Sequence, residues 1–137
     1  MPKLDRILET AIYVDDLDRA ARFYETVLQL PPLLKMERLY AYDVGGASVL
    51  LVFKRGASAQ DMTSPVGTIP GHDAVGRIHV AFAIGADELA DWEARLAVHD
   101  VAVEGRTHCQ AGGDSVYFRD PDGHMLEFAT PGLWRTY

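Results

Sequence analysis

Two carboxylates and one imidazole stand in apolar stretches of this chain of 137 residues. Glu9 opens the run Thr-Ala-Ile-Tyr-Val, His79 opens Val-Ala-Phe-Ala-Ile, and Glu127 lies inside Met-Leu-Glu-Phe-Ala. An ionised carboxylate on a buried strand face must be solvated, paired or bound to a metal, because removing it from water is otherwise costly. One imidazole nitrogen with two carboxylate oxygens suits a divalent first-row ion. We therefore take these three side chains as candidate ligands of one ion, which could be Zn, Ni, Mn, Co or Fe(II).

A tight hairpin is predicted to carry Glu127. The residues Asp120-Pro121-Asp122-Gly123 have the composition of a type I turn. Strands at 115–118 and 125–129 would meet at this turn. Alternation then places Met125, Glu127 and Ala129 on one face of the outgoing strand. His124, at the end of the turn, is expected to point outward.

The order of elements occurs twice along the chain. A strand is predicted at 6–14, an amphipathic helix at 17–29 and two or three further strands across 34–54. The same order returns after residue 77, with a short strand at 101–103. We expect an α+β fold of one domain, residues 1–137, in which two βαβββ modules, at about 5–54 and 77–130, form a curved mixed sheet around a cavity.

The two modules can be compared residue by residue. Glu9 falls over His79 when the opening strands are superposed, and Leu50 falls over Glu127 when Gly46 is set against Gly123. If the modules pair about a pseudo-two-fold axis, equivalent strand positions converge on one cavity. Leu50 would then line that cavity. It would occupy the fourth equivalent position, which would have no metal ligand.

Residues 55–76 join the modules and are rich in Gly, Ser and Pro, without a hydrophobic period. We interpret them as a linker that folds over a site as a lid. His72 would be its substrate contact, or else a solvated loop residue.

Each candidate also has an explanation without ligands. A single Glu in a strand usually faces solvent, and a single His usually completes a hydrogen bond. The equivalence of Glu9 and His79 favours the metal hypothesis for the set as a whole. His108 is a weaker candidate of the same kind as His72.

Composition narrows the classes of partner. The chain is 48% hydrophobic and carries a net charge of −7, without a Lys/Arg cluster that could neutralise phosphates. This argues against nucleic acid and favours a small-molecule substrate. No long apolar run or leader-like N-terminus is present, and one cysteine, Cys109, cannot form an internal disulfide. We expect no membrane association and a cytoplasmic location.

Three stretches resemble the vicinal oxygen chelate superfamily, which includes glyoxalase I, extradiol dioxygenases, fosfomycin-resistance enzymes, methylmalonyl-CoA epimerase and bleomycin-resistance proteins. The stretch from Glu9 to Tyr24 is similar to the family's opening, a ligand strand followed by an Asp-Leu helix start and a Phe-Tyr pair. Residues 77–82 resemble the ligand strand of the second module. Residues 116–127 resemble the closing hairpin, whose Glu is a ligand. The likeness covers nearly the whole chain.

The sequence also departs from particular members. Glyoxalase I has a ligating Glu near the end of its first module, where this chain is aligned with Leu50. Extradiol dioxygenases and fosfomycin-resistance enzymes resemble one another in having His in the first strand, where this chain has Glu9. These departures make lactoylglutathione lyase and dioxygen chemistry less favoured.

The resemblance implies a divalent-metal-dependent enzyme that acts on a small oxygen-chelating substrate, by lyase or isomerase chemistry through a metal-stabilised enolate or oxyanion. Glu127 or Glu9 would also serve as the proton-transfer base. The alternatives are a metal-free binding or sequestration protein of the bleomycin-resistance type, an extradiol-type dioxygenase, and a dimeric scaffold with an unused cavity. A homodimer is expected, because two-module members commonly pair and each half-sheet has open edges.

Overall fold

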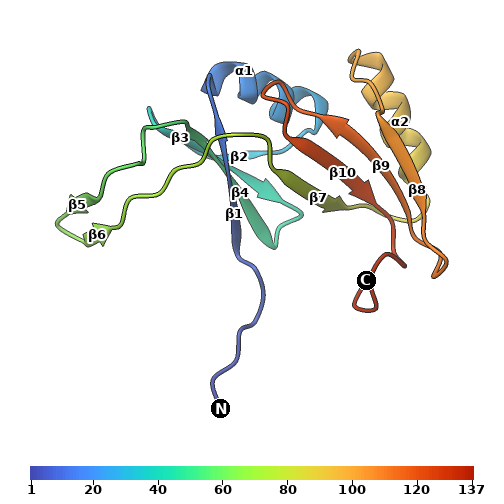
Figure 1. Cartoon of the computed structure of the whole chain (residues 1–137), viewed down its shortest axis with the longest axis horizontal. Helices are drawn as coiled ribbons and strands as arrows, with labels where there is room; N and C mark the ends of the chain where they lie inside the picture. Colours follow the sequence, from blue (N-terminus) through green and yellow to red (C-terminus); the bar gives the residue numbers. More distant parts are fainter. The chain divides into compact units, whose positions relative to one another are not determined.

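The computed structural model describes all 137 residues, which form two compact units, residues 1–76 and 77–137 (Figure 1). None of the helices has the length and apolar character needed to cross a membrane. Unit 1 contains β1 (Glu9–Val14), α1 (Leu17–Ala21), the π-helix η1 (Arg22–Val27), β2 (Pro32–Lys35), β3 (Leu39–Val44), β4 (Ser48–Lys54), β5 (Met62–Ser64) and β6 (Gly67–Ile69). Unit 2 contains β7 (His79–Ala83), α2 (Leu89–Val98), β8 (Gly105–His108), β9 (Asp114–Arg119) and β10 (Met125–Ala129).

The two units repeat one sheet topology. The strand order is β1-β4-β3-β2 in unit 1 and β7-β10-β9-β8 in unit 2. In unit 1, β1 runs parallel to its neighbour β4, and in unit 2, β7 runs parallel to its neighbour β10. The other neighbouring strands are antiparallel. The α+β fold with two βαβββ modules is therefore confirmed.

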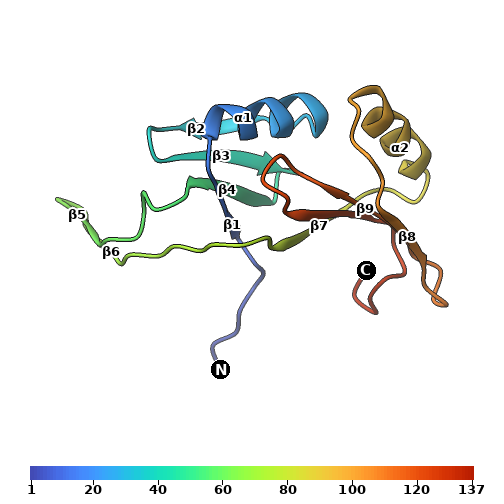
Figure 2. The same ribbon diagram turned by 45° about the horizontal axis from the view of Figure 1, so that its top comes forward.

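The sheet of unit 1 carries its helical segment on one face, as Figure 2 shows. Alternation sends Ile12, Leu50 and Val52 to that face, where they are at most 2% exposed. The Asp16 side chain caps α1 by accepting a hydrogen bond from the Arg19 amide at 3.0 Å. The predicted helix at 17–29 is thus present, but its second half is π-helical.

The sheet of unit 2 buries the apolar side chains of β9 and β10 under α2. The ring of Trp92 on α2 lies 4.7 Å from the ring of Phe128, centroid to centroid. The strand predicted at 101–103 is not formed. The Val101 amide instead bonds back to the Leu96 carbonyl at 2.9 Å, which completes the helix end, and pairing with β9 begins later, at β8.

Residues 55–76 belong to unit 1 and are tied to its sheet rather than forming a bare linker. They include the hairpin of β5 and β6. The Arg55 guanidinium pairs with Asp15 and donates to the carbonyls of Tyr13 at 3.0 Å and Ala74 at 3.3 Å. The His72 amide donates to the Ser58 carbonyl at 2.8 Å. We call residues 70–76, the part held in this way, the wall segment.

Candidate functional site

Glu127 is a buried carboxylate in the middle of unit 2. It is 4% exposed, and its strand neighbours place it on the face opposite α2, as the alternation predicts. Its Oε2 atom accepts a hydrogen bond from Ser115 Oγ at 3.2 Å. Its Oε1 atom lies 3.7 Å from His79 Nε2, which is beyond hydrogen-bond distance. One neutral donor offsets little of the cost of burying this charge, so the carboxylate is suited to a cation.

The His79 imidazole is oriented by a backbone carbonyl. Its Nδ1 atom lies 2.9 Å from the Met125 carbonyl oxygen. Because a carbonyl only accepts, Nδ1 carries a proton, and it is Nε2 that faces Glu127 as the nitrogen able to offer a lone pair to a metal. Metal-binding histidines in proteins are commonly held in this way by a carbonyl or carboxylate on the other nitrogen.

These two groups fit part of a metal site. An imidazole nitrogen and a carboxylate oxygen are both ligands for first-row divalent ions. Neither unit by itself gathers three or more His, Cys, Asp or Glu side chains suited to holding a metal ion. Unit 2 therefore supplies two of the three predicted ligands, and Glu9 lies on the first strand of unit 1.

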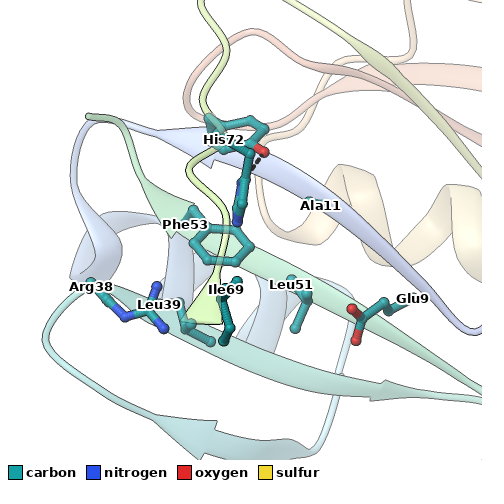
Figure 3. A pocket seen from close by; sticks show the side chains of 9 residues that line it. Glu9, Ala11, Arg38, Leu39, Leu51, Phe53, Ile69 and His72 are labelled. Atoms are coloured by element: carbon teal, nitrogen blue, oxygen red, sulfur yellow. Dashed lines mark hydrogen bonds between the residues drawn. The ribbon is translucent and has the colours of Figure 1, made fainter. Parts of the chain in front are cut away.

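Unit 1 has a cavity of about 400 Å³ on the face of its sheet opposite the helix. Figure 3 shows the Arg38 and Glu9 side chains at opposite ends of a row formed by Leu39, Ile69 and Leu51. His72 and Phe53 stand above this row. The lining residues are Glu9, Ala11, Tyr13, Arg38, Leu39, Leu51, Phe53, Ile69 and His72.

His72 is held in the cavity by aromatic neighbours. Its Nδ1 atom lies 2.6 Å from the Tyr13 hydroxyl, and its ring meets Phe53 edge-on at 4.6 Å between centroids. Burial, with the nearby charge of Asp73, raises the pKa of the Tyr13 phenol. The phenol therefore keeps its proton at neutral pH. His72 remains a candidate substrate contact on this wall.

Leu50 does not line the cavity, contrary to the prediction. In the parallel pairs, Glu9 is opposite Val49 and His79 is opposite Met125, so Leu51 occupies the position equivalent to Glu127. Leu50 faces the helix, and Leu51 lines the cavity. The alignment of Gly46 with Gly123 is one residue out of register. Unit 1 has two successive glycines with positive φ in this turn, Gly45 at 66° and Gly46 at 71°, so a single glycine is a poor anchor.

Two other histidines are accounted for by structure. His124 is 1% exposed rather than outward-facing, because its Nδ1 atom accepts a hydrogen bond from the Ile78 amide at 3.1 Å. The predicted Asp-Pro-Asp-Gly turn is present, with the Gly123 amide donating to the Asp120 carbonyl at 3.0 Å. His108 pairs on the exposed hairpin end with Asp114 at 2.6 Å.

Sequence reasoning missed three participants. Ser115 could have been found, because the predicted hairpin places it on the face of Glu127. The Met125 carbonyl and Arg38 had no sequence signal. The contact of the Met125 carbonyl with His79 depends on the register between strands, and the position of Arg38 in the cavity lining depends on the path of a loop.

Comparison with known proteins agrees with the repeated sheet topology. A sequence model of the Glyoxalase/Bleomycin resistance protein/Dioxygenase superfamily matches residues 6–128. The metallothiol transferase FosB of Bacillus licheniformis is 32% identical over 124 residues, which are 88% of this chain and 72% of that protein. The catechol-2,3-dioxygenase of Bacillus subtilis is 29% identical over 83% of this chain, but over 37% of its own length.

The solved structure of lactoylglutathione lyase from Agrobacterium tumefaciens superposes with a TM-score of 0.88 at 35% identity. The match covers 98% of this chain and 99% of that one. The repeated sheet topology, the paired His79 and Glu127, and the family match over residues 6–128 lead to one conclusion. The chain belongs to the Glyoxalase/Bleomycin resistance protein/Dioxygenase superfamily.

Proposed function

We propose that this chain is a divalent-metal-dependent enzyme that acts on a small oxygen-bearing substrate. The observation that carries the proposal is the arrangement in unit 2. A buried carboxylate with one neutral hydrogen bond lies beside an imidazole nitrogen whose proton is fixed on the opposite side of the ring. Such an arrangement is costly for folding alone and is suited to a cation.

His79 Nε2 and Glu127 Oε1 would be two of the ligands. We propose Glu9 as the third, and what supports it is its place on β1, equivalent to that of His79 on β7. The remaining coordination positions would be open to water or substrate. The identity of the ion stays among Zn, Ni, Mn, Co and Fe(II).

A bound divalent ion would supply Lewis-acid polarisation of a substrate oxygen. Glu127 would keep its Oε2 atom on Ser115, and its Oε1 atom, once released from the ion as the substrate binds, would take up or return a proton. Glu9 would be the second carboxylate able to move a proton. This division of roles favours lyase or isomerase chemistry, in which a proton is removed at one carbon and delivered at another.

A second candidate is transfer of a thiol to a small electrophile. It is favoured by the 32% identity with a metallothiol transferase, whose name states both a metal and a thiol. The structural neighbour at TM-score 0.88 is named a lactoylglutathione lyase, and the glutathione in that name is a thiol compound. Both candidates require the same ion, so a metal assay precedes any choice between them.

Two further assignments belong to this proposal. We propose that His72 contacts substrate from the wall segment, so His72→Ala should lower turnover and leave the metal content unchanged. We also propose that the protein works as a homodimer on small molecules. The competing function is that of a metal-free sequestration protein. Leu51 supports it, because this apolar residue occupies the position in unit 1 that is equivalent to Glu127 in unit 2.

The deciding experiment is elemental analysis of metal-loaded, desalted protein. We expect about one divalent ion per chain, with affinity lowered about tenfold or more in Glu9→Gln, His79→Ala and Glu127→Gln. His108→Ala and Glu104→Gln, both exposed in unit 2, are the matched controls. Loaded protein is then screened with hydroxyketones, diketones, and aldehydes or epoxides with added thiol. A wild-type protein without stoichiometric metal, unchanged by the three substitutions, would favour the sequestration function.

A further inference from the structure

The cavity of unit 1 carries opposite charges at its two ends. Glu9 stands at one end and Arg38 at the other, with Leu39, Ile69 and Leu51 between them (Figure 3). A cavity with an apolar middle and a few placed polar groups is the usual form of a small-molecule site. Its volume of about 400 Å³ lies in the range of such sites.

The Arg38 guanidinium has donors to spare. One of its terminal nitrogens, Nη1, donates to Ser58 Oγ at 3.1 Å, and its other N–H groups meet no acceptor within the chain. Ser58 is 5% exposed, so this bond fixes the guanidinium against a buried partner. The fixed plane leaves the remaining N–H groups free for a second, planar partner.

Arg38 is the cationic side chain among the residues that line the unit 1 cavity. Arg38 lines a neighbouring hollow together with Lys54, Arg55 and one carboxylate, that of Glu37. Arg55 is neutralised by its pair with Asp15. Lys54 and Glu37 offset one another, and Lys54 also lines a further hollow with Asp15, Asp16 and Asp18, so Arg38 itself is the cation offered to the unit 1 cavity.

We infer that Arg38 is an anion-recognition residue and that the unit 1 cavity takes a small organic anion with an apolar body. The carboxylate or phosphonate group of the ligand binds the free N–H groups of Arg38. The apolar body lies over Leu39, Leu51 and Phe53 and is bounded by Ile69. The opposite end of the ligand reaches toward Glu9, where a cation or a hydroxyl group fits and a second anionic group does not.

That this ligand is the substrate depends on the proposed function, but the binding itself does not. Arg38 does not belong to the proposed ligand set, so binding is measured on chelator-treated, metal-free protein. The probes are 4-phenylbutyrate and phenylphosphonate, with the neutral 4-phenylbutanamide and the cationic 4-phenylbutylamine as comparisons. Two-dimensional amide NMR at an ionic strength of about 0.1 M reports affinity and location together.

Both anions should shift the amides of Leu51, Phe53 and Ile69. Arg38→Met should weaken anion binding about tenfold or more, because a charge-assisted hydrogen bond is lost, and should leave amide binding nearly unchanged. Arg38→Lys should show an intermediate loss. Arg22→Met, which removes an exposed cation from the helical segment, is the matched control and should bind as the wild type does.

Glu9→Gln separates this inference from the metal proposal. In metal-free protein it should bind the anions as tightly as the wild type or more tightly, because a like charge is removed, although it lowers metal affinity. The inference is overturned if neither anion binds at about 10 mM. It is equally overturned if Arg38→Met binds the anions as the wild type does, or if the neutral amide binds as tightly as the butyrate.

Discussion

Glu127 shows how much a buried carboxylate depends on its immediate partners. Ser115 holds one oxygen and His79 stands beside the other, while the Met125 carbonyl decides which imidazole nitrogen carries the proton. The proposed chemistry of unit 2 therefore depends on two polar contacts, Ser115 with Glu127 and the Met125 carbonyl with His79.

Ser115→Ala tests this dependence. The substitution leaves both proposed ligands in place but frees Oε2 of Glu127, so metal affinity should fall about 10-fold to 100-fold. Competition against a fluorescent chelator measures it. Ser48→Ala, which removes a hydroxyl from β4 in unit 1, should leave the affinity unchanged. An undiminished affinity in Ser115→Ala would show that Ser115 does not orient the carboxylate.

Tyr42 should make stability depend on alkaline pH. Burial, and then the hydrogen bond to Glu25, raise the pKa of Tyr42 well above its ordinary value of 10.0. Above about pH 10 the unfolded chain loses this proton while the folded chain keeps it, so the free energy of unfolding falls by up to about 1.4 kcal/mol per pH unit. Below that pH both states are protonated and the group adds no slope.

Urea unfolding of wild type and Tyr42→Phe between about pH 8 and about pH 11 measures this slope. The variant should be less stable by about 1 kcal/mol at the lower pH, because the hydrogen bond to Glu25 is lost. It should then lose stability less steeply as the pH rises. Parallel curves for the two proteins would contradict the assignment.

At the scale of elements, the sequence predicted the features that depend on the alternation of side chains along a strand and on turn-forming residues. The period of two placed Glu127 on one strand face with Met125 and Ala129, and Asp-Pro-Asp-Gly located the closing turn. The register between the two modules was harder to predict, because the first module has two consecutive glycines in its turn. The alignment based on one of them was wrong by one residue and assigned Leu50 to the cavity. The inward position of His124 depends on the amide of Ile78, which immediately precedes β7 and donates to the Nδ1 atom of His124.

Arg55 connects two elements that the sequence separates. Its guanidinium joins the end of β1 to the wall segment through Asp15, Tyr13 and Ala74. Arg55→Met should therefore raise amide hydrogen exchange across residues 70–76 about tenfold or more, through easier local opening. Mass-spectrometric exchange would detect this, with Arg106→Met in unit 2 as the control. Unchanged exchange in the wall segment would show that backbone contacts alone hold it.

At the scale of the whole molecule, each sheet ends in a strand with an open edge. These edge strands include β1 and β7, which carry Glu9 and His79. Unpaired strand edges favour association with another chain. We therefore expect sedimentation at micromolar protein to give twice the mass of one chain. A monomeric mass would contradict the homodimer and leave the metal proposal to be judged by elemental analysis alone.

The way in which the wall segment is fastened bears on the speed of ligand binding. A flap that must swing open gives binding rates that level off at high ligand concentration, because opening becomes limiting. Residues 70–76 are instead fixed by the Arg55 guanidinium and by the His72 amide. Ligands should thus enter the unit 1 cavity in a single step, and stopped-flow rates should rise linearly with ligand concentration.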